Sequence, residues 1–269
     1  MMGLKQAIPL RVQNARELGG YRTAGGNTVK SGVLLRSAAL KGISDEDIRC
    51  LRDTYRLQHI VDFRMPFEQI DAEDPEIAGA AYHHLDVIDA AAMGFEGFSD
   101  VDLSKFDIGE IASYAVSSGA IDENMYIGFL ANERGREAFS AFFRILLSAD
   151  PDRAVLWHCT SGKDRTGLAA MLLLSALGVD EETIISDYLL TNVYFAPRIE
   201  ATAQLLKERG CDDGFIKKSV LVFDGVDERF LRNAINYLKK EYGSVMGYIA
   251  DGLEIGREEI AVLKEKYLI

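Results

Sequence analysis

Four short apolar runs along the chain have the character of buried β-strands. They cover Val33–Arg36, His59–Phe63, Ala81–Leu85 and Ala154–His158. Short runs of this kind are typical of parallel strands that are buried on both faces. Segments with helical spacing lie between them. Strands that alternate with helices favour an α/β fold, in which helices flank a central sheet.

Helix signals support this interpretation. Ser44 precedes an acidic turn, and acidic side chains are favoured in the first turn of a helix. Pro66 is placed to begin a second helix, because proline is tolerated in the first turn. From Glu181 onward the pattern is nearly all helical, which predicts a helical carboxyl-terminal part. The clearest helical stretches there are Asp187–Leu190, Phe195–Glu208, Asp227–Glu241 and Glu258–Tyr267.

The stretch from about residue 88 to 124 interrupts the alternation. A connection this long between two strands is unusual and is often a lid or a binding insertion. The alternative is a surface excursion without a role. No repeat or low-complexity tract divides the chain, so we expect a single domain over residues 1–269 that carries this lid-like insertion.

The charge balance limits the classes of partner. The chain has 30 Lys and Arg against 42 Asp and Glu, a formal net charge of -12. Such a chain repels nucleic acid and anionic membrane surfaces, so we expect no nucleic-acid partner. A phosphate-bearing ligand therefore needs a small, local cationic site.

The cysteines and the apolar runs bear on the cellular compartment and on membrane association. Cys50, Cys159 and Cys211 are too few and too scattered for a disulfide framework or a four-thiolate zinc site. The amino terminus lacks the apolar core of a secretory signal. The longest apolar run, Leu168–Gly178, is well short of the ~20 residues of a membrane span. We expect a cytoplasmic protein with no integral membrane association, and export without a signal peptide stays open.

The candidate chemistry lies in residues 155–168, VLWHCTSGKDRTGL. An apolar strand runs into Cys159, a short polar loop with one glycine follows, and a strongly apolar helix comes after Arg165. Backbone N–H groups of such a loop and of the first helical turn converge on one point, where the helix dipole favours negative charge. This predicts a phosphate-binding loop, called here the anion loop. Its residues are Thr160, Ser161, Gly162, Lys163, Asp164 and Arg165.

Cys159 has the setting of a nucleophile. Free cysteine titrates near ~8.5, and thiols beside cations at helix amino termini titrate well below that value. We therefore expect a thiolate that attacks phosphorus in line. Arg165 presents a planar fork to two phosphoryl oxygens, which lysine does not. The Thr166 hydroxyl is placed to support the thiolate as a leaving group.

The spacing of Cys159 and Arg165 alone carries no weight, because it occurs twice. Cys50 and Arg56 repeat it inside a charged helical pattern that has no glycine and no preceding strand. We interpret Cys50 as a packed structural cysteine. At Cys159 the whole context of strand, loop and helix carries the prediction, because two cations beside an inert buried thiol are hard to explain.

At these residues the sequence resembles the cysteine-dependent phosphatases, and in particular the atypical bacterial tyrosine phosphatases that also act on phosphoinositides. The motif HCTSGKDRTG at residues 158–167 carries the resemblance, which extends over nearly the whole chain except about residues 88–150. The other family-like segments are Asn14–Tyr21, Leu35–Ser37, Val61–Arg64 with Glu68, Asp187–Asn192 and Tyr242–Tyr248.

The resemblance implies a tyrosine-phosphatase-like central sheet and a two-step mechanism through a phosphocysteine, with no metal and no cofactor. It implies a phosphotyrosine protein or a phosphoinositide as substrate and inorganic phosphate as product. Hydrolysis of phosphotyrosine is the main expectation. The alternatives are a phosphoinositide or inositol phosphate phosphatase with the same site, and a non-catalytic phosphate-binding module, although Cys159 and Arg165 are both present.

The resemblance leaves the general acid open. Larger tyrosine phosphatases carry it in a Trp-Pro-Asp loop, whereas the only tryptophan here, Trp157, lies on the strand before Cys159. Asp164 matches an aspartate of the bacterial branch that protonates the leaving phenolate. Asp86 resembles the acid position of dual-specificity phosphatases, and Asp89 is a weaker third candidate. We favour Asp164 over the alternative that it only pairs with a neighbouring basic group.

Lys163 has two interpretations. It adds positive potential to the anion loop, or it holds a second phosphate, as basic loop residues do in the lipid and inositol phosphatases that this loop resembles. A highly phosphorylated ligand needs further cations, for which the candidates are Arg22, Lys30 and Arg36.

Neighbouring residues receive supporting roles. His158 is expected to point away from the phosphate, to hold the loop and to tune the thiolate. Arg64 and Glu68 are expected to form an ion pair between a strand end and the next helix. His83 and His84 point to opposite faces of a strand, which rejects a shared metal site with Asp86.

Overall fold

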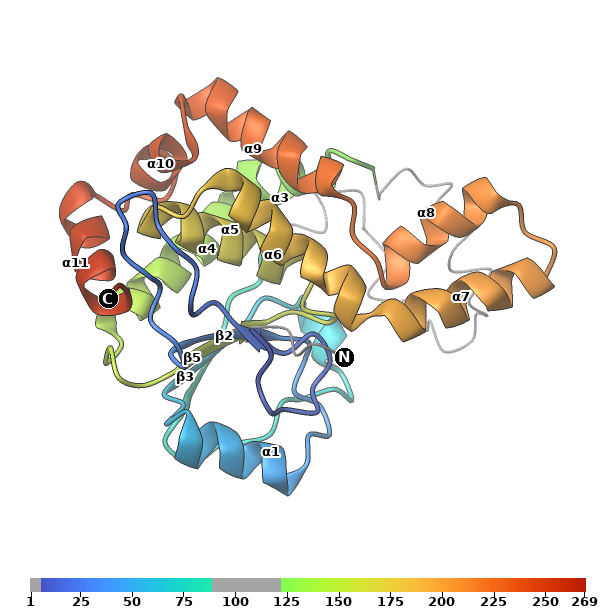
Figure 1. Cartoon of the computed structure of the whole chain (residues 1–269), viewed down its shortest axis with the longest axis horizontal. Helices are drawn as coiled ribbons and strands as arrows, with labels where there is room; N and C mark the ends of the chain where they lie inside the picture. Colours follow the sequence, from blue (N-terminus) through green and yellow to red (C-terminus); the bar gives the residue numbers. More distant parts are fainter. Residues whose placement is uncertain (1–5, 89–121) are drawn as a thin grey trace.

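The computed structural model describes residues 6–88 and 122–269 of the chain (Figure 1). Its centre is a five-stranded sheet with the order β1-β2-β5-β3-β4. Four strands run parallel, and β1 is antiparallel to β2 at one edge. The strands are β1 Arg16–Glu17, β2 Leu34–Ser37, β3 His59–Asp62, β4 Ala81–His84 and β5 Val155–His158.

The four strands predicted from the apolar runs are confirmed, and the packing explains their pattern. Leu35 and Ile60 both lie in register with Leu156, and all three face the smaller of two cores. Their neighbours Leu34 and Val155 face the larger core on the other side of the sheet. Because both faces of the central strands are buried, apolar residues follow one another without alternation.

Helices cover both faces of the sheet, as the α/β interpretation expects. In Figure 1, α1 lies on one side, and α4, α5 and α6 lie on the other with α9, α10 and α11 outside them. The α-helices of the described residues are α1 Asp45–Arg49, α3 Met125–Ala131, α4 Glu133–Ser148, α5 Asp164–Leu177, α6 Glu181–Tyr194, α7 Ala196–Glu208, α8 Asp213–Phe223, α9 Glu228–Tyr242, α10 Val245–Gly247 and α11 Arg257–Tyr267.

Local sequence accounts for the ends of several helices. Ser44 caps α1 by accepting a hydrogen bond from the backbone N–H of Asp47 (3.1 Å), and a π-helical turn, Cys50–Thr54, follows α1. Pro66 begins a short 3-10 helix, Pro66–Gln69. The apolar helix α5 is buried along most of its length and ends at Gly178, whose φ of 89° favours glycine. A helix buried in this way is held firmly, and it carries the anion loop at its beginning.

Several elements of the described residues were not predicted. The edge strand β1 has only two residues and therefore no pattern, and α3 and α4 lie within the region of about residues 88–150 in which no motif was recognised. The lid-like insertion expected at about residues 88–124 lies outside the described residues except at its ends. No helix within residues 6–88 or 122–269 is long and apolar enough to cross a membrane.

Candidate active site

The centre of the sheet places Cys159. The last residue of β5, His158, lies in register with Ser37 of β2 and Asp62 of β3. Cys159 follows it at the carboxyl end of the parallel strands and is 2% exposed. The anion loop then leads into α5, which begins at Asp164. Strand, cysteine, loop and helix thus stand in the order that the sequence predicts.

Side chains beneath the anion loop hold it by donating hydrogen bonds to its carbonyl groups. Asn14 Nδ2 donates to the carbonyl oxygens of Ser161 (3.2 Å) and Gly162 (2.9 Å), and Arg36 Nη2 donates to that of Gly162 (2.9 Å). Gly162 has a φ of 65°, and a Cβ there would lie 2.1 Å from the carbonyl oxygen of Ser37. Glycine is therefore required at this position. With these two carbonyls held by donors, a turn of this kind has its amides free to form an anion-binding concavity.

Arg165 is bound by a carboxylate that the sequence interpretation had placed elsewhere. Its Nη1 and Nη2 lie 2.5 and 2.8 Å from the two carboxylate oxygens of Glu68, and Nη1 also donates to the carbonyl of Phe63 (3.2 Å). Burial opposes the charge of Arg165, but Glu68 outweighs burial and raises the pKa of the guanidinium above its ordinary value. Arg165 is therefore a fixed and permanent cation.

The expected ion pair between Arg64 and Glu68 is wrong. Arg64 instead binds Asp62 (2.8 Å) and Asp74 (3.0 Å), whereas Glu68 binds Arg165 and also accepts a hydrogen bond from the Thr160 hydroxyl. The family-like Glu68 was recognised in the sequence, but its connection to the site was missed.

The Asp164 carboxylate is held by Tyr126 and Lys163, and Tyr188 supports Tyr126. Tyr126 of α3 donates to Asp164 Oδ1 (2.5 Å), and the Tyr188 hydroxyl of α6 lies 2.8 Å from that of Tyr126. Lys163 Nζ lies 3.3 Å from Asp164 Oδ2. Tyr126 was not predicted as a site residue, because α3 lies in the region without a recognised motif. Asp164 adjoins Arg165 in the chain, but its carboxylate contacts Tyr126 and Lys163.

Asp86 lies on a different element, beyond the end of β4. Its carboxylate accepts hydrogen bonds from the backbone N–H of Ile88 (3.0 Å) and from Arg134 Nη1 (3.1 Å). Burial raises the pKa of Asp86, and these hydrogen bonds and the charge of Arg134 oppose the rise. A raised pKa suits a proton donor. Asp89, the third candidate, lies outside the described residues.

The Lys163 side chain is directed at backbone carbonyl groups near the end of α8. Its ammonium group donates to the carbonyl oxygens of Leu221 (2.8 Å) and Gly225 (3.3 Å), near the end of α8, and the residue is 6% exposed. In this arrangement its three donors are directed to those carbonyls and to Asp164.

The other cations suggested for a second phosphate do not gather around Lys163. Lys30 binds Asp152, which precedes β5 and so lies at the opposite end of that strand from Cys159. Arg22 adjoins Thr23, which pairs with Val179 beyond the far end of α5. Arg36 lies beneath the anion loop, as described above. These three residues therefore form no common headgroup site with Lys163.

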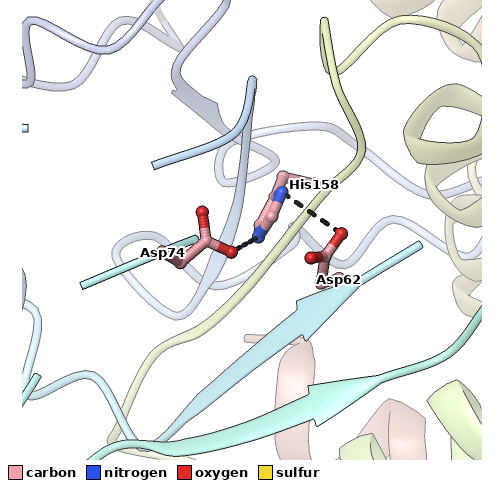
Figure 2. Close-up of side chains that lie close together, drawn as sticks. All are labelled: Asp62, Asp74 and His158. Carbon is pink, nitrogen blue, oxygen red and sulfur yellow. Dashed lines mark ion pairs between the residues drawn. The ribbon is translucent and has the colours of Figure 1, made fainter. Parts of the chain in front are cut away.

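His158 lies behind the loop in a buried group of charges (Figure 2). Its Nε2 is 2.9 Å from Asp74 Oδ2 and its Nδ1 is 3.7 Å from Asp62 Oδ1. Its Nδ1 also lies 3.2 Å from the carbonyl oxygen of Cys159, a contact that links the ring to the base of the loop. The side chain of His158 is fully buried among these groups.

The group of Asp62, Asp74 and His158 has the spacing of metal ligands, with its donor atoms within 4.8 Å of one another. However, Arg64 already donates to both carboxylates. A buried guanidinium in that position repels a metal ion, so the arrangement fits an ion network. His83 and His84 have separate partners: His83 Nε2 lies 2.9 Å from His59, and His84 Nε2 lies 2.7 Å from the carbonyl of Arg64.

One family model and three known proteins are similar to this chain. A model described as the tyrosine phosphatase family matches residues 9–269. A candidate tyrosine-protein phosphatase of Cupriavidus necator is 34% identical over 259 residues, which cover 96% of this chain and 86% of the relative. The triple specificity protein phosphatase PtpB of Mycobacterium tuberculosis is 32% identical over 121 residues, 41% of this chain and 43% of the relative. A tyrosine-protein phosphatase of Nostoc commune is 26% identical over 241 residues, 88% of this chain and 74% of the relative.

The chain therefore belongs to the tyrosine phosphatase family. The resemblance that the sequence motifs indicated is confirmed at the level of the family.

Proposed function

We propose that the chain hydrolyses phosphate monoesters, chiefly phosphotyrosine in proteins, through a phosphocysteine intermediate. The observation that carries this proposal is the anion loop itself. Its carbonyls are held from beneath by Asn14 and Arg36, the buried Cys159 stands at its base, and Arg165 is fixed at the start of α5. This arrangement suits a tetrahedral oxyanion that is attacked from below.

In the first step the Cys159 thiolate attacks phosphorus and the bond to the ester oxygen breaks. Loop N–H groups, from Thr160 onward, and Arg165 hold the three equatorial oxygens, over which negative charge spreads in the transition state. The departing phenolate takes a proton from a carboxylic acid. We assign this role to Asp164, which lies at the edge of the loop.

In the second step water attacks phosphorus and the sulfur–phosphorus bond breaks. The carboxylate that gave up its proton accepts one from the water, and inorganic phosphate leaves. The thiolate of Cys159 is restored. The Thr166 hydroxyl is buried and has no hydrogen-bond partner within the described part of the chain, so it is available to the departing thiolate.

Asp86 remains the second candidate for the acid. Its raised pKa favours the protonated form, which a general acid requires. Asp164 has the advantage of position, because it belongs to the loop and is oriented by Tyr126. The two candidates lie on different elements, so separate substitutions distinguish them.

Phosphoinositides are the second substrate class. The mycobacterial relative is named a triple specificity phosphatase, which supports substrates beyond phosphotyrosine. Against a headgroup role, Lys163 is engaged by two carbonyls and Asp164. We therefore rank phosphotyrosine first and expect lipid hydrolysis to be the slower activity.

Phosphate release from a phosphotyrosine peptide and from a phosphoinositide panel, measured side by side with Cys159→Ser as the blank, tests the proposal. Faster release from the peptide is the expected result. Faster release from a lipid would replace the main substrate class. Phosphopeptide binding without any release by the unaltered protein would identify a non-catalytic binding module.

A further inference from the structure

A buried group of charges lies beneath the anion loop. Arg16, Arg36 and Asp187 are each 2% exposed or less. Arg16 Nε lies 3.1 Å from Asp187 Oδ1, and Arg36 Nη1 lies 2.8 Å from Asp187 Oδ2. Within residues 6–88 and 122–269, no other carboxylate binds either arginine. Two guanidinium groups therefore share one carboxylate, and the group carries one surplus positive charge.

The ionisation states agree with this count. Burial opposes the charge of Asp187, but Arg16 and Arg36 outweigh burial and hold the pKa of Asp187 below its ordinary value. Tyr21 donates to Asp187 Oδ1 (3.0 Å), and burial, followed by the charge of Asp187, raises the pKa of the phenol, which stays neutral. The surplus charge is therefore not cancelled inside the group.

Arg36 connects this surplus charge to the loop. Its Nη2 donates to the carbonyl of Gly162 (2.9 Å), and its buried Nε has no hydrogen-bond partner in the described part of the chain. Burial, followed by the charge of Arg16, lowers the pKa of Arg36 to about 10, and the negative charge of Asp187 opposes this fall, as a thiolate at Cys159 would. Arg36 is a buried cation that shares its only carboxylate with Arg16 in the described part of the chain, so a further anion nearby would stabilise it.

The other cations around Cys159 have carboxylates of their own. Arg165 binds Glu68, Lys163 lies beside Asp164, and Arg64 binds Asp62 and Asp74. Among the described residues, the group beneath the loop therefore holds the positive charge that is left for a thiolate to balance.

We propose that Arg36 is a positioning residue whose surplus charge stabilises first the Cys159 thiolate and then the phosphoryl dianion in the anion loop. Its second action is to hold the Gly162 carbonyl, which keeps the loop amides directed at the ligand. Arg36 does not touch the reacting atoms. The inference rests on the proposed function for the role of Cys159, and it concerns the source of the charge that activates it.

The test is the pH dependence of alkylation of Cys159 by iodoacetamide, read by mass spectrometry on the peptide that contains it. Cys50 and Cys211 are partly exposed and are replaced by serine in every sample. Arg36→Met removes the charge. Lys30→Met is the matched control, since it removes one positive charge at the far end of β5.

The midpoint of the alkylation profile is expected to rise by about one pH unit or more in Arg36→Met, and to stay unchanged in Lys30→Met. Asp187→Asn removes the shared carboxylate, so its midpoint is expected to fall. A folded Arg36→Met protein with the midpoint of the unaltered chain would overturn the proposal. If Arg36→Met does not fold, an unchanged or higher midpoint in Asp187→Asn overturns it.

Alkylation does not require turnover, so this inference and the proposed function fail separately. Absence of phosphate release by the unaltered protein contradicts the proposed function and leaves the alkylation result standing. Normal phosphate release together with an unshifted profile contradicts only the role of Arg36.

Discussion

Glu68 binds both terminal nitrogens of Arg165 from outside the anion loop, with Nη2–Oε1 at 2.8 Å and Nη1–Oε2 at 2.5 Å. The two residues are separated by 97 positions in the chain. The short 3-10 helix that follows β3 therefore fixes the orientation of the arginine through Glu68. The backbone N–H of Met65 donates to the same carboxylate (2.8 Å), which fixes Glu68 in turn.

Loss of this carboxylate is expected to reduce catalysis. Glu68→Gln keeps the shape of the side chain but removes the charge that orients Arg165. Hydrogen bonds to charged groups contribute about 1.5–3 kcal/mol, so kcat/KM for a phosphotyrosine peptide should fall roughly 10- to 100-fold. Steady-state kinetics on Glu68→Gln, with the exposed Glu73→Gln as control, checks this. Equal rates in the two variants would contradict an orienting role.

The same pair predicts a pH dependence of stability. Burial opposes the charge of Glu68, but Arg165 outweighs burial and holds the pKa of Glu68 below its ordinary value. The stabilisation is therefore fully present above the unfolded pKa of about 4.3, and it is lost as the pH falls through the lower folded pKa.

In thermal melts, the unaltered protein should have a higher Tm than Glu68→Gln. This difference in Tm, the margin, should be widest at pH 7. The margin should narrow at pH values below about 4. A margin that stays constant from pH 7 to pH 3 would show that the pair does not titrate in this way.

Gly162 is expected to be intolerant of any side chain. In Gly162→Ala the new Cβ meets the carbonyl of Ser37 at 2.1 Å, and alanine must also adopt a φ of 65°. The clash and the left-handed backbone together should destabilise the protein by about 2–4 kcal/mol and abolish phosphate binding. Gly26→Ala is the matched control, because its φ is 89° and nothing lies within 4 Å of the added Cβ. Denaturant unfolding should show a loss of only about 1–2 kcal/mol there.

The general acid is identified by its dependence on the leaving group. Asp164→Asn should slow hydrolysis of phosphotyrosine by about 100-fold, and should slow p-nitrophenyl phosphate much less, because nitrophenolate leaves without a proton. Asp86→Asn serves as the comparison. If Asp86→Asn shows the larger and leaving-group-dependent loss, the acid role belongs to Asp86.

The sequence predicted the parts of the molecule that depend on local pattern. The four buried strands are apolar runs, and the anion loop is one continuous stretch between β5 and α5, so residue types and their order suffice. Ser44 was recognised as a helix start for the same reason, because a cap involves only the next few residues.

The parts that were missed depend on contacts between distant segments. The partner of Glu68 lies beyond β5, and the carbonyls held by Asn14 are almost 150 residues away from it in the chain. Tyr126 meets Asp164 only because α3 packs beside α5. Lys163 belongs to the loop motif, yet carbonyls near the end of α8 decide where its ammonium group points. Periodicity carries no information about such pairings.

The most direct test of the central claim is to trap the phosphocysteine. The enzyme is mixed with a phosphotyrosine peptide, quenched in acid within milliseconds, digested, and analysed by mass spectrometry. Phosphate should appear on Cys159, and Cys159→Ser should bind the peptide without turnover. Turnover of Cys159→Ser near the rate of the unaltered enzyme, or turnover without a phosphate on Cys159, would contradict the assignment of this cysteine as the nucleophile.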